Sequence, residues 1–87
     1  MERRGILRKI TLNDEQMCSS KVIFAVVEQS GGETMKIQII RELLEDSHKN
    51  EFDQFWNTVK KSGKNSIVGK KVIMIQNNFN FESIKFY

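Results

Sequence analysis

The sequence predicts a small α+β domain, mostly β, in which a curled five-stranded antiparallel sheet carries one helix between its third and fourth strands. Residues 50–63 have apolar side chains at helical spacing, whereas most other apolar residues fall in short runs rich in β-branched side chains. Strand-like runs lie on both sides of that helix, which is typical of the α+β class. The chain has 87 residues with no visible linker or repeat, so we expect a single domain over 1–87.

The helix is predicted from Asn50 to Gly63. The spacing i, i+3, i+4, i+7 places four apolar side chains on one face: Phe52, Phe55, Trp56 and Val59. Asn50 is a typical capping residue, and Gly63 is suited to end the helix in a left-handed conformation. The rest of the domain must therefore cover an aromatic stripe.

Three strands are predicted before the helix. Residues 5–12 form the first, at an edge of the sheet, with Ile6, Ile10 and Leu12 on one side. Residues 21–29 are apolar at both parities, which predicts a central strand buried on both sides.

A hairpin at 30–33, where Gly31 and Gly32 tolerate positive φ, leads to the third strand, which starts at Thr34. Its inward side is predicted from one alternating set of apolar residues: Met35, Ile37 and Ile39. From Arg41 to Leu44 the sequence is compatible either with more strand or with a short helical turn.

Two strands are predicted after the helix, the first at 67–75. In the last segment Phe79 and Phe81 share one parity, and Ile84 and Phe86 share the other. A turn or bulge near residues 82 and 83 would account for this change.

This order of elements resembles that of OB-fold domains, five-stranded barrels with a helix between the third and fourth strands. The resemblance covers essentially the whole chain and lies in element order alone, with no residue motif. It implies an OB-like barrel. The alternative is a β-grasp arrangement, which uses the hairpin, the helix and the strand after it and leaves the first strand as an addition.

Charge is segregated along the chain, whose formal net charge is +3. Residues 1–10 carry +3 and residues 57–87 carry +5, whereas residues 11–56 carry −5. The basic ends either form a face for a polyanion or neutralise the acidic middle within the fold.

Composition also indicates where the protein works. Cys18 is the only cysteine, which is typical of a reducing intracellular compartment, cytoplasm or nucleus. The longest apolar run, residues 22–27, is far shorter than the roughly 20 residues of a membrane span. We therefore expect no membrane partner.

Catalytic and metal motifs do not stand out. His48 is the only histidine, and it follows an acidic stretch, 42–46, whose carboxylates are more typical of solvated or capping groups than of a metal site. We therefore expect no enzyme activity, no cofactor and no metal ion.

The remaining class of function is a binding module. Its predicted ligand is single-stranded nucleic acid, DNA or RNA. Such ligands need cations for the phosphates and aromatic rings on which bases stack. We assign the stacking to Phe79 and Phe81, and phosphate or base contacts to six further residues: Lys36, Gln38, Arg41, Lys70, Lys71 and Lys85. The competing interpretation places the phenylalanines in the core.

An alternative function is a small protein–protein interaction module, either a complex subunit or an inhibitor. Edge strands at 5–12 or 83–87 would then add to a partner protein or to a second copy of the chain. Salt separates the two functions, because binding of nucleic acid weakens steeply with salt and docking of apolar surfaces does not.

Overall fold

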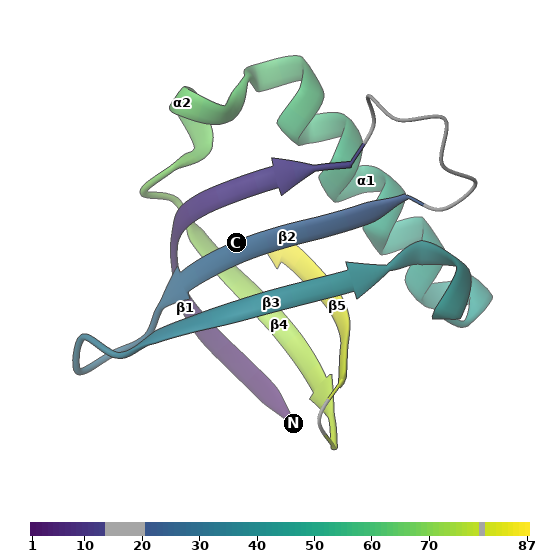
Figure 1. The fold of residues 1–87 in the computed structure, drawn as a ribbon, viewed down its shortest axis with the longest axis horizontal. Coiled ribbons are helices and arrows are strands. Elements are labelled where there is room, and N and C mark those ends of the chain that lie inside the picture. The colour runs from purple at the N-terminus through teal and green to yellow at the C-terminus, as the bar shows by residue number, and fades with distance from the viewer. Residues whose placement is uncertain (14–20, 79) are drawn as a thin grey trace.

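A computed structural model describes residues 1–13, 21–78 and 80–87 (Figure 1). It contains the five strands of the prediction and a long helix between the third and fourth. A 3₁₀ turn and a one-turn helix complete the order, which is β1 (Glu2–Leu12), β2 (Val22–Glu28), β3 (Thr34–Ile40), η1 (Arg41–Leu43), α1 (Asp46–Ser62), α2 (Lys64–Ile67), β4 (Lys71–Asn77) and β5 (Asn80–Phe86). The predicted fold class is thus confirmed.

The strands form one antiparallel sheet in the order β3-β2-β1-β4-β5. β1 is its central strand: residues 6–12 of β1 pair with β2, and residues 2–6 pair with β4. The edge position predicted for residues 5–12 is therefore wrong. The alternative β-grasp arrangement is also wrong, because it would leave this strand as an addition to the sheet. The sheet curls but is not closed, because its edge strands β3 and β5 form no ladder within the described residues.

A β-bulge at Arg8 sets which side chains of β1 face the core. Leu7 lies opposite Val27 and Lys9 lies opposite Val26, so Arg8 is the extra residue. Leu7 is fully buried, whereas Ile6 is only partly buried. The expectation that Ile6 faces inward was wrong because the bulge reverses the parity of the strand on one side of Arg8.

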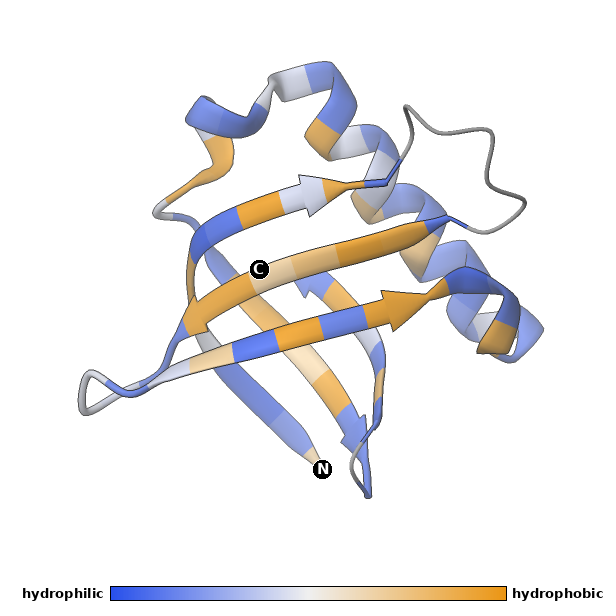
Figure 2. Cartoon of the chain, in the orientation of Figure 1, coloured by the Kyte–Doolittle hydropathy of each residue, from blue (hydrophilic) through white to orange (hydrophobic). Residues whose placement is uncertain are grey.

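The predicted alternation of β3 is confirmed: orange and blue segments follow one another along it in Figure 2. Ile37 and Ile39 are buried, and Lys36 and Gln38 are exposed. The hairpin before β3 also forms as expected, with positive φ at both glycines of the turn.

α1 packs its aromatic stripe on the inner side of the sheet. Phe52, Phe55, Trp56 and Val59 are all buried, as predicted. The ring of Phe55 stacks on Phe86 of β5 with 4.7 Å between centroids. Burial of aromatic side chains of this size is the main stabilising contribution that one helix can make to so small a core.

The ends of α1 differ in how well the sequence predicts them. The helix starts at Asp46, four residues before the predicted cap Asn50, and Glu45 stands at its N-cap position without a side-chain hydrogen bond. It ends at Gly63 as predicted, with φ +82° and its N–H donating to the Val59 carbonyl. The strand expected from residue 67 starts only at Lys71, because Ile67 belongs to α2 and is buried.

A second bulge lies in β5. Ser83 is opposite Ile75 and Phe81 is opposite Gln76, so Glu82 is the extra residue. The predicted change of parity near residues 82 and 83 is confirmed. The bulge buries Ser83, whose hydroxyl donates to the Glu51 carboxylate of α1.

The bend of β1 requires a glycine at position 5. A Cβ on Gly5 would lie 2.6 Å from the Glu28 carbonyl oxygen and would also clash with the Val27 side chain. We expect Gly5→Ala to lower the free energy of unfolding by about 1–3 kcal/mol, as overpacking typically does. Urea denaturation checks this, with the exposed Lys64→Ala as the control; equal midpoints for the two variants would contradict the close packing.

Candidate nucleic-acid interface

Where β1, β2 and β3 lie together, the side of the sheet turned away from α1 carries an exposed aromatic ring among polar side chains. We call this surface the outer face; it consists of Lys9, Thr11, Phe24, Val26, Lys36 and Gln38. The register places Thr11 and Gln38 on either side of Phe24, and Lys9 and Lys36 on either side of Val26. Residues directly opposite in a sheet point to the same side, so these six side chains form one surface.

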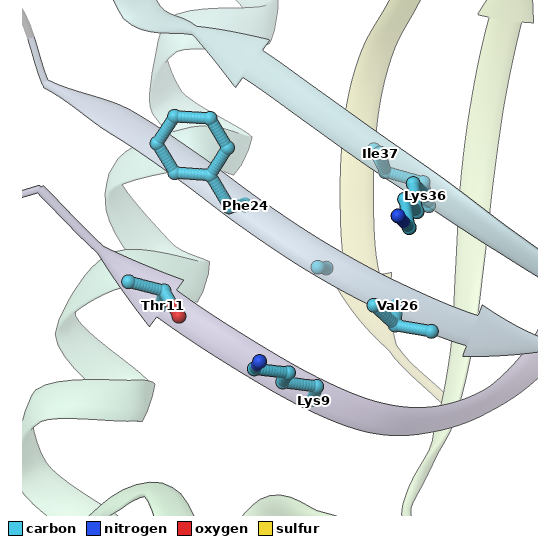
Figure 3. A pocket seen from close by; sticks show the side chains of 7 residues that line it. Lys9, Thr11, Phe24, Val26, Lys36 and Ile37 are labelled. Atoms are coloured by element: carbon cyan, nitrogen blue, oxygen red, sulfur yellow. The ribbon is translucent and has the colours of Figure 1, made fainter.

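Phe24 is at the centre of the outer face. It is 43% exposed, although it lies on a strand that is hydrogen-bonded on both sides. Figure 3 shows its ring projecting from β2, with Thr11 and Lys9 on β1 and Lys36 on β3. A shallow hollow of about 290 Å³ lies among these side chains. The expectation that residues 21–29 are buried on both sides is therefore wrong for this residue, because α1 covers only the inner side.

The lysines of the outer face are available to a ligand. Lys9 and Lys36 are exposed, and neither forms a salt bridge with another described residue. Because Val26 separates them, their Cα atoms are about two interstrand spacings, roughly 10 Å, apart. By contrast, Arg8 is held by Glu28 at 3.0 Å. The outer face thus presents, beside an aromatic ring, two lysines that have no ion-pair partner among the described residues.

The eight predicted site residues do not form one groove. Lys36 and Gln38 belong to the outer face. Lys70 and Lys71 lie beside the first half of β1, where the Lys70 carbonyl accepts from the Leu7 N–H at 2.9 Å. Lys85 is on β5, in a hollow shared with Gln54 and Thr58 of α1.

Phe81, one of the two predicted stacking residues, does not supply an exposed ring. It is partly buried and packs against the core, which agrees with the competing interpretation for this residue. Phe79, the other, lies outside the described residues. The ring exposed on the outer face is that of Phe24, on another strand.

Sequence reasoning missed Phe24, Lys9 and Thr11. A signal for Phe24 was present: the hairpin at 30–33 fixes the pairing of β2 with β3, and this pairing puts Phe24 opposite the polar Gln38. Lys9 and Thr11 are harder to find, because their side depends on the bulge at Arg8.

Arg41 was predicted to contact phosphates, but its guanidinium is engaged within the fold. Its Nε and Nη2 donate to the two carboxylate oxygens of Asp53 at 2.8 and 3.0 Å. This hydrogen bonding, with the attraction of opposite charges, lowers the pKa of Asp53 below its ordinary value of 3.8 and raises the pKa of Arg41. Arg41 therefore ties η1 to α1.

Other chemistry has little support in the described part of the chain. No three His, Cys, Asp or Glu side chains of residues 1–13, 21–78 and 80–87 are placed to hold a metal ion. His48 lies in the first turn of α1, with its Nε2 3.5 Å from the carboxylate of Glu82 on β5. None of the helices described above has both the length and the apolar character that crossing a membrane requires.

Comparison with protein-family models, with curated proteins and with solved structures gives no match for this chain. We therefore infer a function from the geometry and chemistry of the outer face.

The Arg41–Asp53 pair predicts a pH dependence of stability. Because the pKa of Asp53 is lowered in the folded state, the pair stabilises the fold above the ordinary aspartate pKa, and this contribution is lost as the pH falls through the folded value. We expect Asp53→Asn to lower the urea midpoint at neutral pH, and we expect its difference from wild type to shrink progressively as the pH falls below the ordinary aspartate pKa of 3.8. Glu33→Gln, in the exposed hairpin, is the control; a difference for Asp53→Asn that does not change with pH would contradict the assignment.

Proposed function

We propose that this protein is a non-enzymatic module that binds single-stranded nucleic acid through its outer face. The observation that carries the proposal is the exposed ring of Phe24, on a strand that is paired on both sides. Lys9 and Lys36 lie on the neighbouring strands, opposite Val26, which is the next residue of β2 on the same side as Phe24. This combination of aromatic surface and cations is what proteins use to hold unpaired strands.

Each side chain of the outer face has a role in this proposal. A base stacks on the Phe24 ring, and a stack of this kind contributes about 1–3 kcal/mol. Lys9 and Lys36 neutralise the phosphates on either side. Thr11 and Gln38 offer hydroxyl and amide groups to base edges or to the sugar. A single strand is favoured over a duplex, because the flat face of a base is accessible only when the base is unstacked.

The resemblance in element order to OB-fold domains supports the same surface. OB-fold domains bind oligonucleotides on the face formed by their second and third strands, and here Phe24 and Lys36 lie on β2 and β3. We further propose an intracellular location, where such ligands occur and where a lone cysteine is typical.

A second candidate is docking of a protein at the open seam between β3 and β5. Leu43 is 79% exposed there, beside a pocket of about 230 Å³ whose apolar lining includes Ile40, Leu44 and Phe81. A strand from a partner or from a second copy would add to the unpaired edge of β3. Sedimentation velocity tests for self-association, and Leu43→Asp is the variant expected to abolish it.

Fluorescence anisotropy with labelled oligo(dT) tests the nucleic-acid proposal. We expect Phe24→Ala to weaken binding by about ten-fold or more, since a stack contributes about 1–3 kcal/mol, without lowering thermal stability. Lys9→Ala and Lys36→Ala should each weaken binding and reduce the slope of log K against log salt by about 0.7.

Lys61→Ala is the matched control, because it removes the same charge from the exposed side of α1. It should leave affinity nearly unchanged. If Phe24→Ala binds like wild type, or if Lys61→Ala weakens binding as much as Lys36→Ala, the outer face is not the site. A large loss of stability in Phe24→Ala would instead make it a structural residue.

A further inference from the structure

We infer that a bound single strand continues past the outer face to a second stacking platform, formed by Tyr87 and Arg4. This inference rests on the proposed function and deepens it, because it defines the path and the length of the ligand. It concerns the first half of β1, where β4 begins and β5 ends.

A hollow of about 370 Å³ marks this second platform. Its lining includes Arg4, Ile6, Lys71 and Tyr87, together with the hairpin glycines. Tyr87 is 55% exposed, and the Arg4 guanidinium carbon lies 5.2 Å from the centre of its ring. A cation held over one face of an aromatic ring fixes the ring and leaves its other face to a base.

The two platforms lie on the same side of the sheet. Ile6 is paired with Glu28 on β2 and with Lys71 on β4, and Glu28 has the same parity as Phe24 and Val26. The Arg8–Glu28 ion pair, at 3.0 Å, bridges the stretch between them. The surface of the outer face therefore continues around the bend of β1 to Arg4.

Charge is favourable along this path. Lys9 and Lys36 stand at the Phe24 end and Lys71 stands at the Tyr87 end, and none of the three has a salt-bridge partner among the residues described. Arg4 is bound to Glu2 at 3.0 Å, so its charge is partly neutralised, and we assign it the role of positioning Tyr87. We assign the phosphate contact at the Tyr87 end to Lys71.

The separation of the platforms sets the length of the ligand. From Thr11, opposite Phe24, to Arg4 is seven residues of β1, at most about 23 Å at roughly 3.3 Å per residue. A strand with about 3.4 Å between stacked bases would cover this with about seven nucleotides. This length lies within the range of about 4–16 nucleotides that one OB-fold domain occupies.

Tyr87 is the only tyrosine of the chain, so it can be observed alone. We would label the protein with 3-fluorotyrosine and titrate it with oligo(dT) of about 12 nucleotides, inside the usual site size. The ¹⁹F resonance should shift along the same concentration curve as the anisotropy of the labelled oligonucleotide. Phe24→Ala should move both curves together to higher concentration.

Affinity provides the second readout. Tyr87→Ala should weaken binding by about ten-fold, whereas Tyr87→Phe, which keeps the ring, should bind like wild type. Lys71→Ala should weaken binding more than Lys61→Ala, which removes a charge from α1.

Three results distinguish a failure of the second platform from a failure of the proposed function. Binding by anisotropy with no ¹⁹F shift overturns the second platform and leaves the outer face as the site. A ¹⁹F shift with wild-type affinity in Tyr87→Ala also overturns it, because the ring would then be near the strand without stacking. No binding of any oligonucleotide overturns the proposed function itself.

Discussion

The architecture depends on one constraint: β1 has to serve as the partner of β2 through one half and of β4 through the other. The strand meets this constraint with a close-packed bend at Gly5 and an extra residue at Arg8. Without the bulge, Leu7 and Ile10 would point to opposite sides of the sheet, and one of them would leave the core. The curl of the sheet and the identity of its inner side both follow from this strand.

The curl gives the domain two unequal sides. The inner side receives the aromatic stripe of α1, and this single layer of helix completes the core. The outer side of β1, β2 and β3 has no helix over it in the part of the chain that the structure describes. An exposed phenylalanine side chain at this position does not contribute the roughly 1.5–3 kcal/mol to stability that full burial would contribute. In the proposed function, a stacked base would cover this ring.

Local patterns allowed correct predictions of several elements. The stripe from Phe52 to Val59, the hairpin glycines, the alternation of β3 and the bulge near Glu82 all follow from a few neighbouring residues, and all are confirmed. The central position of β1 and the bulge at Arg8 depend on pairings between distant segments, which a local pattern does not contain. Phe24 was missed for the same reason, since it is exposed only because α1 packs on the other side of the sheet.

The ion pairs likewise depend on contacts between distant segments, which a local pattern does not contain. Arg41 was a reasonable phosphate contact from the sequence alone, but its partner Asp53 lies about two turns into α1, and only the fold brings that helix close to Arg41. Arg8 with Glu28 likewise joins the basic start of the chain to its acidic middle. Part of the charge segregation is thus neutralised within the fold, and the lysines that remain free of described ion pairs on the sheet carry the binding proposal.

The most direct test of the account is an amide ¹H–¹⁵N correlation spectrum recorded during titration with unlabelled oligo(dT). The largest shift changes should fall on one surface, at Lys9, Thr11, Phe24, Val26 and Lys36, and the exposed residues of α1 should be unaffected. Changes concentrated at α1, or at the seam around Leu43, would contradict the assignment of the outer face.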